Sequence, residues 1–130
     1  MTDSYSTNRP NALLVDDNTF VLAMLSEQLD KLGYNCCMAS DGVEALVKFG
    51  QSQFDIVITD INMPRMDGYA LTLKLREQEK HTPIIGITAN PLSEMLHHAL
   101  QAGMDTWLTK PISLTQLKNC LLDTLKNSSA

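Results

Sequence analysis

Five short apolar segments alternate along the chain with five amphipathic segments, and this alternation limits the possible folds more than any other feature. Three of the short segments are apolar almost throughout, as expected for strands of a parallel sheet that helices cover on both faces. The amphipathic segments place their apolar residues at helical spacing. The predicted strands are Ala12–Val15, Cys36–Ala39, Ile56–Thr59, Ile84–Thr88 and Thr106–Leu108. The predicted helices are Thr19–Leu32, Asp41–Phe49, Tyr69–Lys80, Pro91–Ala102 and a fifth that begins after Ser113 and extends to Leu125.

Glycine and proline mark the expected helix ends. Gly33, Gly50 and Gly103 each follow a helical segment, and glycine is the residue that most often ends a helix. Pro91 suits the first turn of the fourth helix, where a missing N–H costs nothing.

Strands that alternate with helices pair in parallel through right-handed crossovers. The 130 residues therefore predict an α/β fold, with a doubly wound, flavodoxin-like sheet in the order 2-1-3-4-5 and five helices. We expect a flexible leader over residues 1–11, one domain over 12–126 and a polar tail over 127–130. Ligands of such sheets bind beyond the carboxyl ends of the strands, where the first and third strands diverge.

Composition excludes several partners. The net charge is −5 and the ten basic residues are scattered, which disfavours direct binding to nucleic acid. No segment reaches the roughly 18 apolar residues that span a membrane, so we expect a cytoplasmic domain without membrane contact of its own. The odd count of three cysteines, without metal-ligand spacing, indicates reduced thiols.

Three carboxylates end neighbouring strands. Asp16 and Asp17 follow the first strand and Asp60 follows the third, so all three should meet in one crevice. Carboxylates this close repel one another unless a cation compensates, and Mg²⁺ is the usual hard cation with oxygen ligands in phosphoryl-transfer sites. The alternative interpretation, that Asp16 and Asp17 only cap the first helix, leaves Asp60 unexplained.

A hydroxyl and an ammonium group are expected at the same edge. Thr88 ends the fourth strand and Lys110 follows the fifth. A hydroxyl and an ammonium group that face three carboxylates suit the binding of a phosphoryl group. Lys110 would pair with one phosphoryl oxygen and Thr88 would hydrogen-bond another. Asp60 would then attack phosphorus in line with the leaving group.

From Asn11 to Leu125 the chain resembles the receiver domains of two-component response regulators and hybrid sensor kinases. The spacings between Asp17, Asp60, Thr88 and Lys110 agree with that family as well. The matching segments are Leu14–Asn18, Thr59–Gly68, Ile87–Asn90 and Leu108–Pro111.

The resemblance implies a role for each residue of the acidic crevice. Asp60 matches the phosphoacceptor of the family. Asp17 and Asp60 match direct Mg²⁺ ligands, the backbone carbonyl of Asn62 completes the protein ligands, and Asp16 holds the ion through water. Gly68 is expected to supply a backbone conformation that is difficult for other residues.

The resemblance also implies a conformational switch. Thr88 matches the hydroxyl that moves toward the phosphoryl group, Lys110 its charge partner, and the Lys110–Pro111 bond is expected to be cis. The coupled aromatic, commonly Tyr or Phe in the family, is Trp107 here, and a plain half-buried aromatic is the alternative for this residue.

Partner contacts are expected at the first helix. Val21 can serve the core, so Phe20 and Leu22 are predicted to form an apolar docking surface, with accidental surface apolarity as the rival interpretation. In the family this region meets the helical domain that donates the phosphoryl group. The implied partners are a histidine kinase domain, a His phosphotransfer domain, or both, and the domain itself is expected to be a monomer or weak dimer.

Other functions fit the sequence less well. Aspartyl-phosphate phosphatases and mutases need an acid two residues after the nucleophile, where this chain has Asn62, and a flavodoxin-like electron carrier needs a Ser/Thr-rich loop after the first strand. Among receivers, the segments Gly86–Asn90 and Gly103–Asp105 are similar to those of virulence-sensor and capsule-sensor hybrid kinases. A hybrid sensor kinase is thus the favoured source, and a free-standing response regulator is the alternative.

Overall fold

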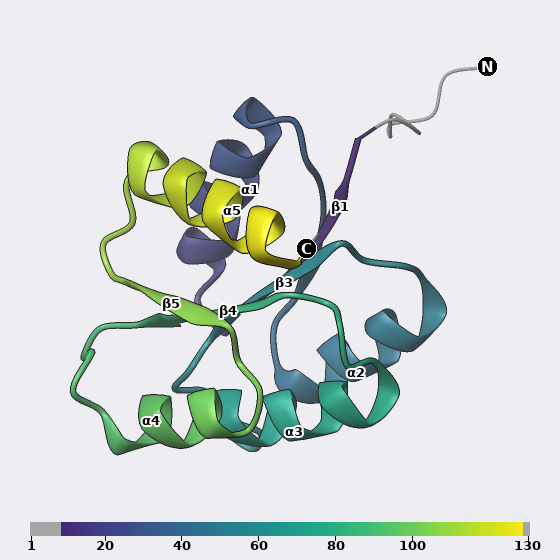
Figure 1. Ribbon diagram of the computed structural model, residues 1–130, viewed down its shortest axis with the longest axis vertical. Coiled ribbons are helices and arrows are strands. Elements are labelled where there is room, and N and C mark those ends of the chain that lie inside the picture. The colour runs from purple at the N-terminus through teal and green to yellow at the C-terminus, as the bar shows by residue number, and fades with distance from the viewer. Residues whose placement is uncertain (1–8, 129–130) are drawn as a thin grey trace.

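The computed structural model describes residues 9–128, and it contains five strands that alternate with five helices over that range (Figure 1). The strands are β1 (Asn11–Val15), β2 (Asn35–Ala39), β3 (Ile56–Asp60), β4 (Ile84–Thr88) and β5 (Thr106–Thr109). The helices are α1 (Thr19–Lys31), α2 (Gly42–Gln51), α3 (Gly68–Gln78), α4 (Glu94–Gln101) and α5 (Leu114–Ser128).

All strand pairs are parallel and the strand order is β2-β1-β3-β4-β5, which confirms the predicted doubly wound sheet. Helices α1 and α5 cover one face of the sheet, and α2, α3 and α4 cover the other (Figure 1). The sheet thus separates two apolar layers, and its order reverses direction between β1 and β3.

Alternate side chains of the central strands pack into the two apolar layers. In β1, Ala12 and Leu14 pack toward α1 and α5, whereas Leu13 and Val15 pack toward α2, α3 and α4. All four are at most 1% exposed. Because both faces are buried there, β1 is apolar from Ala12 to Val15, and the next polar residue, Asp16, falls at the carboxyl edge.

Helix α4 begins three residues later than predicted. Asn90 and Ser93 close a turn through the Ser93 N–H and the Asn90 carbonyl, at 3.1 Å. The Ser93 hydroxyl then caps the helix by accepting a hydrogen bond from the backbone N–H of Leu96. Pro91 therefore lies in the preceding turn rather than in the first helical turn. The prediction that Gly50 follows the second helix was also wrong, since Gly50 lies inside α2, one residue before that helix ends.

The predicted leader and tail both extended too far into the domain. Arg9 is anchored, because its guanidinium donates to the carbonyl oxygens of Asp30 and Tyr34 at 2.8 and 2.9 Å. Asn11 already belongs to β1, and residues 127 and 128 belong to α5. The rest of the predicted leader and tail, residues 1–8 and 129–130, lies outside the described residues.

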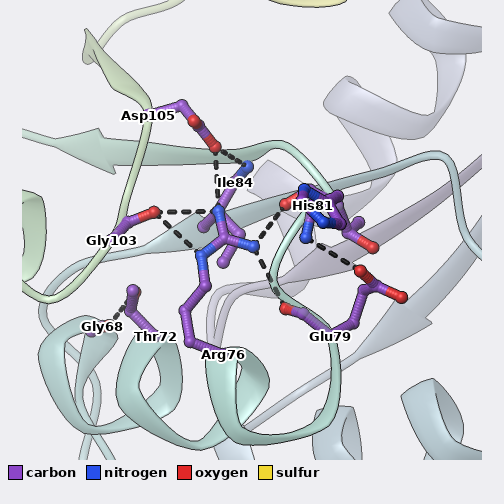
Figure 2. A network of polar contacts seen from close by, with 9 residues as sticks. Gly68, Thr72, Arg76, Glu79, His81, Ile84, Gly103 and Asp105 are labelled. Atoms are coloured by element: carbon purple, nitrogen blue, oxygen red, sulfur yellow. Dashed lines mark hydrogen bonds and ion pairs between the residues drawn. The ribbon is translucent and has the colours of Figure 1, made fainter. Parts of the chain in front are cut away.

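Arg76, near the end of α3, joins several segments at the amino ends of the strands (Figure 2). Its guanidinium donates to the carbonyl oxygen of Thr82 at 2.7 Å and to that of Gly103 at 2.8 Å. It also lies 3.0 Å from Oδ2 of Asp105, an oxygen that accepts a hydrogen bond from the backbone N–H of Ile84. This network fastens α3, the start of β4 and the α4–β5 turn together, at the sheet edge opposite the acidic residues.

Within the described part of the chain, no helix combines the length and the apolar character that a membrane span requires. The three cysteines all lie in that part and are free thiols.

Candidate functional site

Three carboxylates meet at the carboxyl edge of the sheet. Asp16 and Asp17 follow β1, and Asp60 is the last residue of β3, which lies beside β1 in parallel register. One carboxylate oxygen from each lies within 4.8 Å of the others, and no other such cluster occurs among residues 9–128. Asp16 and Asp60 are buried and Asp17 is exposed, so the cluster opens to solvent on one side.

Local hydrogen bonds fix the buried Asp16. Its backbone N–H donates to the carbonyl oxygen of Ala39 at 3.1 Å, which places it directly beyond the end of β2 as well. Its Oδ1 accepts a hydrogen bond from the backbone N–H of Asn18 at 2.9 Å. Asn18 in turn caps α1, since its side chain accepts from the N–H groups of Phe20 and Val21. The capping role of Asn18 was not predicted, although Asn before an amphipathic segment is a recognisable cap signal.

Burial makes this cluster electrostatically unfavourable on its own. Burial raises the pKa of the Asp60 carboxyl above its ordinary value, and the neighbouring Asp16 charge raises it further, whereas Lys110 lowers it in part. The pKa of Asp16 is also raised, chiefly by burial, against the lowering effects of the Asn18 N–H and of Lys110. The crevice therefore holds more negative charge than it can stabilise well.

Lys110 is the cation of the site. Its Nζ lies 3.4 Å from Oδ2 of Asp16 and 3.6 Å from Oδ2 of Asp60. The backbone N–H of Lys110 donates to the Thr88 carbonyl at 2.8 Å, and the peptide bond between Lys110 and Pro111 is cis, as the resemblance implied. These contacts place the ammonium group between the two buried carboxylates.

The residues present fit a hard divalent cation. Oδ2 of Asp16 is buried and accepts no hydrogen bond, although the Lys110 ammonium is near. The cluster offers carboxylate oxygens alone, which are the ligands that Mg²⁺ and Ca²⁺ prefer. The backbone N–H of Asn62 lies 3.3 Å from Oδ1 of Asp60, so the loop after β3 contacts the same carboxylate.

Thr88 and Trp107 lie on neighbouring strands. Thr88 is fully buried, and its hydroxyl donates to the carbonyl of Asn90 and accepts from the N–H of the same residue, both at 3.0 Å. Trp107 pairs with Gly86 across β4 and β5 and is 40% exposed. In this structure the Thr88 hydroxyl is thus engaged with the β4–α4 loop, and the indole lies partly in solvent.

The two predicted docking residues differ in their exposure to solvent. Phe20 is 86% exposed in the first turn of α1, whereas Leu22 is only 6% exposed and belongs to the core. The prediction for Leu22 was wrong because α1 turns the face of Leu22, Leu25 and Leu29 toward the sheet. Val21, which we expected to serve the core, is partly buried and packs against the same cluster.

Gly68 has a different role from the predicted one. Its φ is not positive. A Cβ atom at this position would lie 2.8 Å from Cα of Ile61 and 3.1 Å from the carbonyl oxygen of Asp60. Glycine is needed because the start of α3 passes directly over the end of β3. The backbone conformation that is difficult for other residues falls instead on Arg65, whose φ is 66°.

The fold and the site together define a doubly wound α/β domain with an acidic, lysine-bearing pocket at its topological switch point. The family model described as the response regulator receiver domain matches residues 12–122, and the chain belongs to this family.

Curated relatives include sensor kinases. The chain is 45% identical over 109 residues to the sensor histidine kinase RcsC of Escherichia coli, covering 84% of this chain and 12% of that protein. It is also 45% identical over 109 residues to the sensor protein EvgS of E. coli, covering 84% of this chain and 9% of that protein. The chain therefore spans only a small part of the kinases it matches.

Solved structures agree with this assignment. The receiver domain of sensor histidine kinase PA1611 from Pseudomonas aeruginosa, with a magnesium ion coordinated in its active site cleft, superposes with a TM-score of 0.84 at 32% identity. That match covers 91% of this chain and 98% of the other. The chemotaxis protein CheY4 of Vibrio cholerae gives a TM-score of 0.85 at 34% identity, covering 89% and 98%. The chain is a receiver domain of the kind found in hybrid sensor histidine kinases.

Proposed function

We propose that this receiver accepts a phosphoryl group on Asp60 from a phosphohistidine, in a reaction that requires Mg²⁺. The observation on which this proposal rests is the position of Lys110, whose Nζ lies within 3.6 Å of carboxylate oxygens of both Asp16 and Asp60. A cation held there can bind an anion that arrives between the two carboxylates.

Asp60 supplies the nucleophile. One of its carboxylate oxygens attacks phosphorus, an oxygen–phosphorus bond forms, and the phosphorus–nitrogen bond of the phosphohistidine breaks with its electron pair passing to the imidazole. Lys110 contacts one phosphoryl oxygen with its ammonium group, and the Thr88 hydroxyl hydrogen-bonds another after leaving Asn90. Such transfers depend on positioning and charge stabilisation more than on covalent chemistry by the protein.

The metal ligands in this proposal are Asp17, Asp60 and the backbone carbonyl of Asn62, with Asp16 acting through water. Mg²⁺ bound there would neutralise charge on the carboxylates and on the phosphoryl oxygens. The buried Oδ2 of Asp16, which accepts no hydrogen bond, and the raised pKa of Asp60 support a cation at this position.

Phosphorylation would then act as a switch. Movement of the Thr88 hydroxyl toward the phosphoryl group vacates space beside β5, and Trp107 turns inward to fill it. The half-exposed indole in the present structure is the starting state for that movement.

The proposed partners are a histidine kinase domain and a His phosphotransfer domain, in a phosphorelay of the cytoplasm. We place this receiver within a hybrid sensor kinase and expect the domain itself to be a monomer or weak dimer. The similarity to RcsC and EvgS supports this source. Phe20 is the proposed contact for the helical, histidine-bearing domain, since its ring is exposed in the first turn of α1, three residues along the chain from Asp17. A free-standing response regulator is the alternative source, and Asn62 argues against a phosphatase.

Phosphorylation by a small-molecule donor tests the proposal. In acetyl phosphate and Mg²⁺, the wild-type domain should gain the mass of one phosphoryl group, and Asp60→Asn should gain none. Asp67→Asn is the matched control, because asparagine preserves the cap that Asp67 provides to Ala70 and leaves the crevice intact. Undiminished phosphorylation of Asp60→Asn would refute the assignment of the acceptor.

A further inference from the structure

The loop between β3 and α3 contains a strained turn at Arg65. The backbone N–H of Met66 donates to the carbonyl oxygen of Pro64 at 2.7 Å, which closes a three-residue turn centred on Arg65. With φ of 66°, Arg65 adopts the γ-turn of rare handedness, and it is the one non-glycine residue with a positive φ in the described range 9–128. Such a conformation persists only where the surroundings impose it.

The side chain of Arg65 supplies one of those constraints. Its Nη2 lies 2.7 Å from Oδ2 of Asp41, the residue that caps α2. Asp41 uses its two oxygens separately, because Oδ1 accepts the N–H of Glu44 at 2.8 Å while Oδ2 binds Arg65. Asp41 is thus positioned by the helix that it caps, and its side chain is 19% exposed.

A second contact joins the same loop to α2. Gly42 follows Asp41, and a Cβ atom at position 42 would lie 2.8 Å from Sδ of Met66. The absence of a side chain at Gly42 lets Met66 lie against the start of the helix. The loop is therefore attached to α2 through both Arg65 and Met66.

The other end of the loop reaches the acceptor carboxylate. The N–H of Asn62 lies 3.3 Å from Oδ1 of Asp60, and the N–H of Gly68 donates to the carbonyl of Ile61 at 2.8 Å. These bonds close the base of the loop. Asn62 and Arg65 belong to this one short loop, so the turn at Arg65 affects where Asn62 lies.

We propose that Arg65 and Asp41 are positioning residues, which hold the β3–α3 loop so that Asn62 and the Asp60 carboxylate present their oxygens to the metal ion. This inference rests on the proposed function. Mg²⁺ requires near-ideal octahedral geometry, so a small displacement of one ligand weakens its binding.

An ion pair with a merely structural role would leave the Mg²⁺ affinity unchanged when it is removed. The Arg65 side chain is 72% exposed, and pairs of this kind contribute little to global stability. Loss of the pair should therefore affect the loop and the metal and leave the unfolding midpoint nearly unchanged.

Two substitutions isolate the pair. Asp41→Asn removes the charge but keeps an oxygen that can cap α2. Arg65→Asn removes the cation but introduces a residue that tolerates positive φ. Asp30→Asn is the matched control, since it removes another surface ion pair, the 3.1 Å contact with Arg9, at the far edge of the sheet.

Mg²⁺ affinity by calorimetry, amide hydrogen exchange of Met66 and Gly68, and the rate of phosphorylation by acetyl phosphate are measured on each protein. We expect both pair variants to bind Mg²⁺ on the order of fivefold more weakly and to exchange these amides faster, and the double variant to be no worse than either single one. The control should match the wild type.

Wild-type Mg²⁺ affinity in both pair variants, with the wild type itself phosphorylated, would overturn the inference and leave the proposed function standing. The inference also fails if the loop amides exchange faster but the Mg²⁺ affinity is unchanged. A wild-type domain that neither binds Mg²⁺ nor accepts a phosphoryl group would refute the proposed function, and this inference with it.

Discussion

Lys110 stands closer to Asp16 than to Asp60, with its Nζ 3.4 Å from Oδ2 of Asp16 and 3.6 Å from Oδ2 of Asp60. A single cation is thus shared between two buried carboxylates, and it leaves Oδ2 of Asp16 without a hydrogen bond. The negative charge of the resting pocket is therefore only partly compensated, and this imbalance has measurable consequences for stability and for metal binding.

The first prediction concerns the metal-free fold. Because the folded state raises the pKa of Asp60, it binds the proton more tightly than the unfolded chain does, and stability falls as pH rises from about the ordinary value of 3.8 through the raised folded pKa. Asp60→Asn removes this penalty. Its free energy of unfolding at pH 7 in EDTA should exceed that of the wild type by about 1 kcal/mol.

Urea unfolding at pH 7 and near pH 4 measures this difference. The advantage of Asp60→Asn should shrink as the pH falls toward 3.8, because the wild-type carboxyl then becomes protonated in both states. We expect this gain in stability from neutralising the buried Asp60 rather than the exposed Asp17. An advantage that grows at low pH would contradict the sign of the effect.

The second prediction concerns metal removal. A ligand that binds only the folded state stabilises it, by about 2.7 kcal/mol at a hundredfold excess over its dissociation constant. Mg²⁺ should therefore raise the thermal midpoint of the wild type, and EDTA should reverse the rise. Asp17→Ala should lose most of it, whereas Asp67→Asn should keep it. Calorimetric scans that show an equal rise in Asp17→Ala would exclude Asp17 as a ligand.

The third prediction concerns the switch. Trp107 is the one tryptophan of the chain, so its fluorescence reports the environment of β5 directly. Mg²⁺ and beryllofluoride, a phosphoryl mimic, should shift its emission as the 40% exposed indole becomes buried. Thr88→Ala should show a much smaller shift, and Thr88→Ser, which keeps the hydroxyl, should respond like the wild type. An unchanged signal with mimic binding verified separately would show that the indole does not move.

The fourth prediction concerns the network around Arg76. The side chain of Arg76 is 16% exposed and donates to the carbonyls of Thr82 and Gly103 while pairing with Asp105. Arg76→Met should lower the free energy of unfolding by about 2–4 kcal/mol, because these partners lose their donor in a partly buried place. Arg65→Met, at an exposed pair, should cost less than about 1 kcal/mol.

Urea denaturation compares the two variants, and acetyl phosphate tests their activity. Arg76→Met should still be phosphorylated wherever it is folded, since the network lies at the sheet edge opposite Asp60. Equal losses of stability in the two variants would show that burial does not strengthen the Arg76 contacts.

Much of the site was predictable because it depends on order along the chain. Parallel strands bring their carboxyl ends to one edge, so Asp16, Asp17 and Asp60 had to meet once the strands were recognised. The predicted strand ends agree with the structure to within one residue. The apolar runs of the strands and the helical spacing of the amphipathic segments are local properties, and local patterns can be read without knowing the packing.

The sequence alone thus determined the α/β class and the edge at which the acidic residues gather, since strand–helix alternation is local and parallel strands end at one edge. The strand order was predicted as the one typical of a doubly wound sheet of this size. Tertiary structure decided what depends on distant neighbours. The rotation of α1 against the sheet buried Leu22 and exposed Phe20, and the packing of α2 brought Asp41 within 2.7 Å of Arg65. No local pattern encodes such contacts, because each requires two surfaces that meet only after the sheet and its helices have packed.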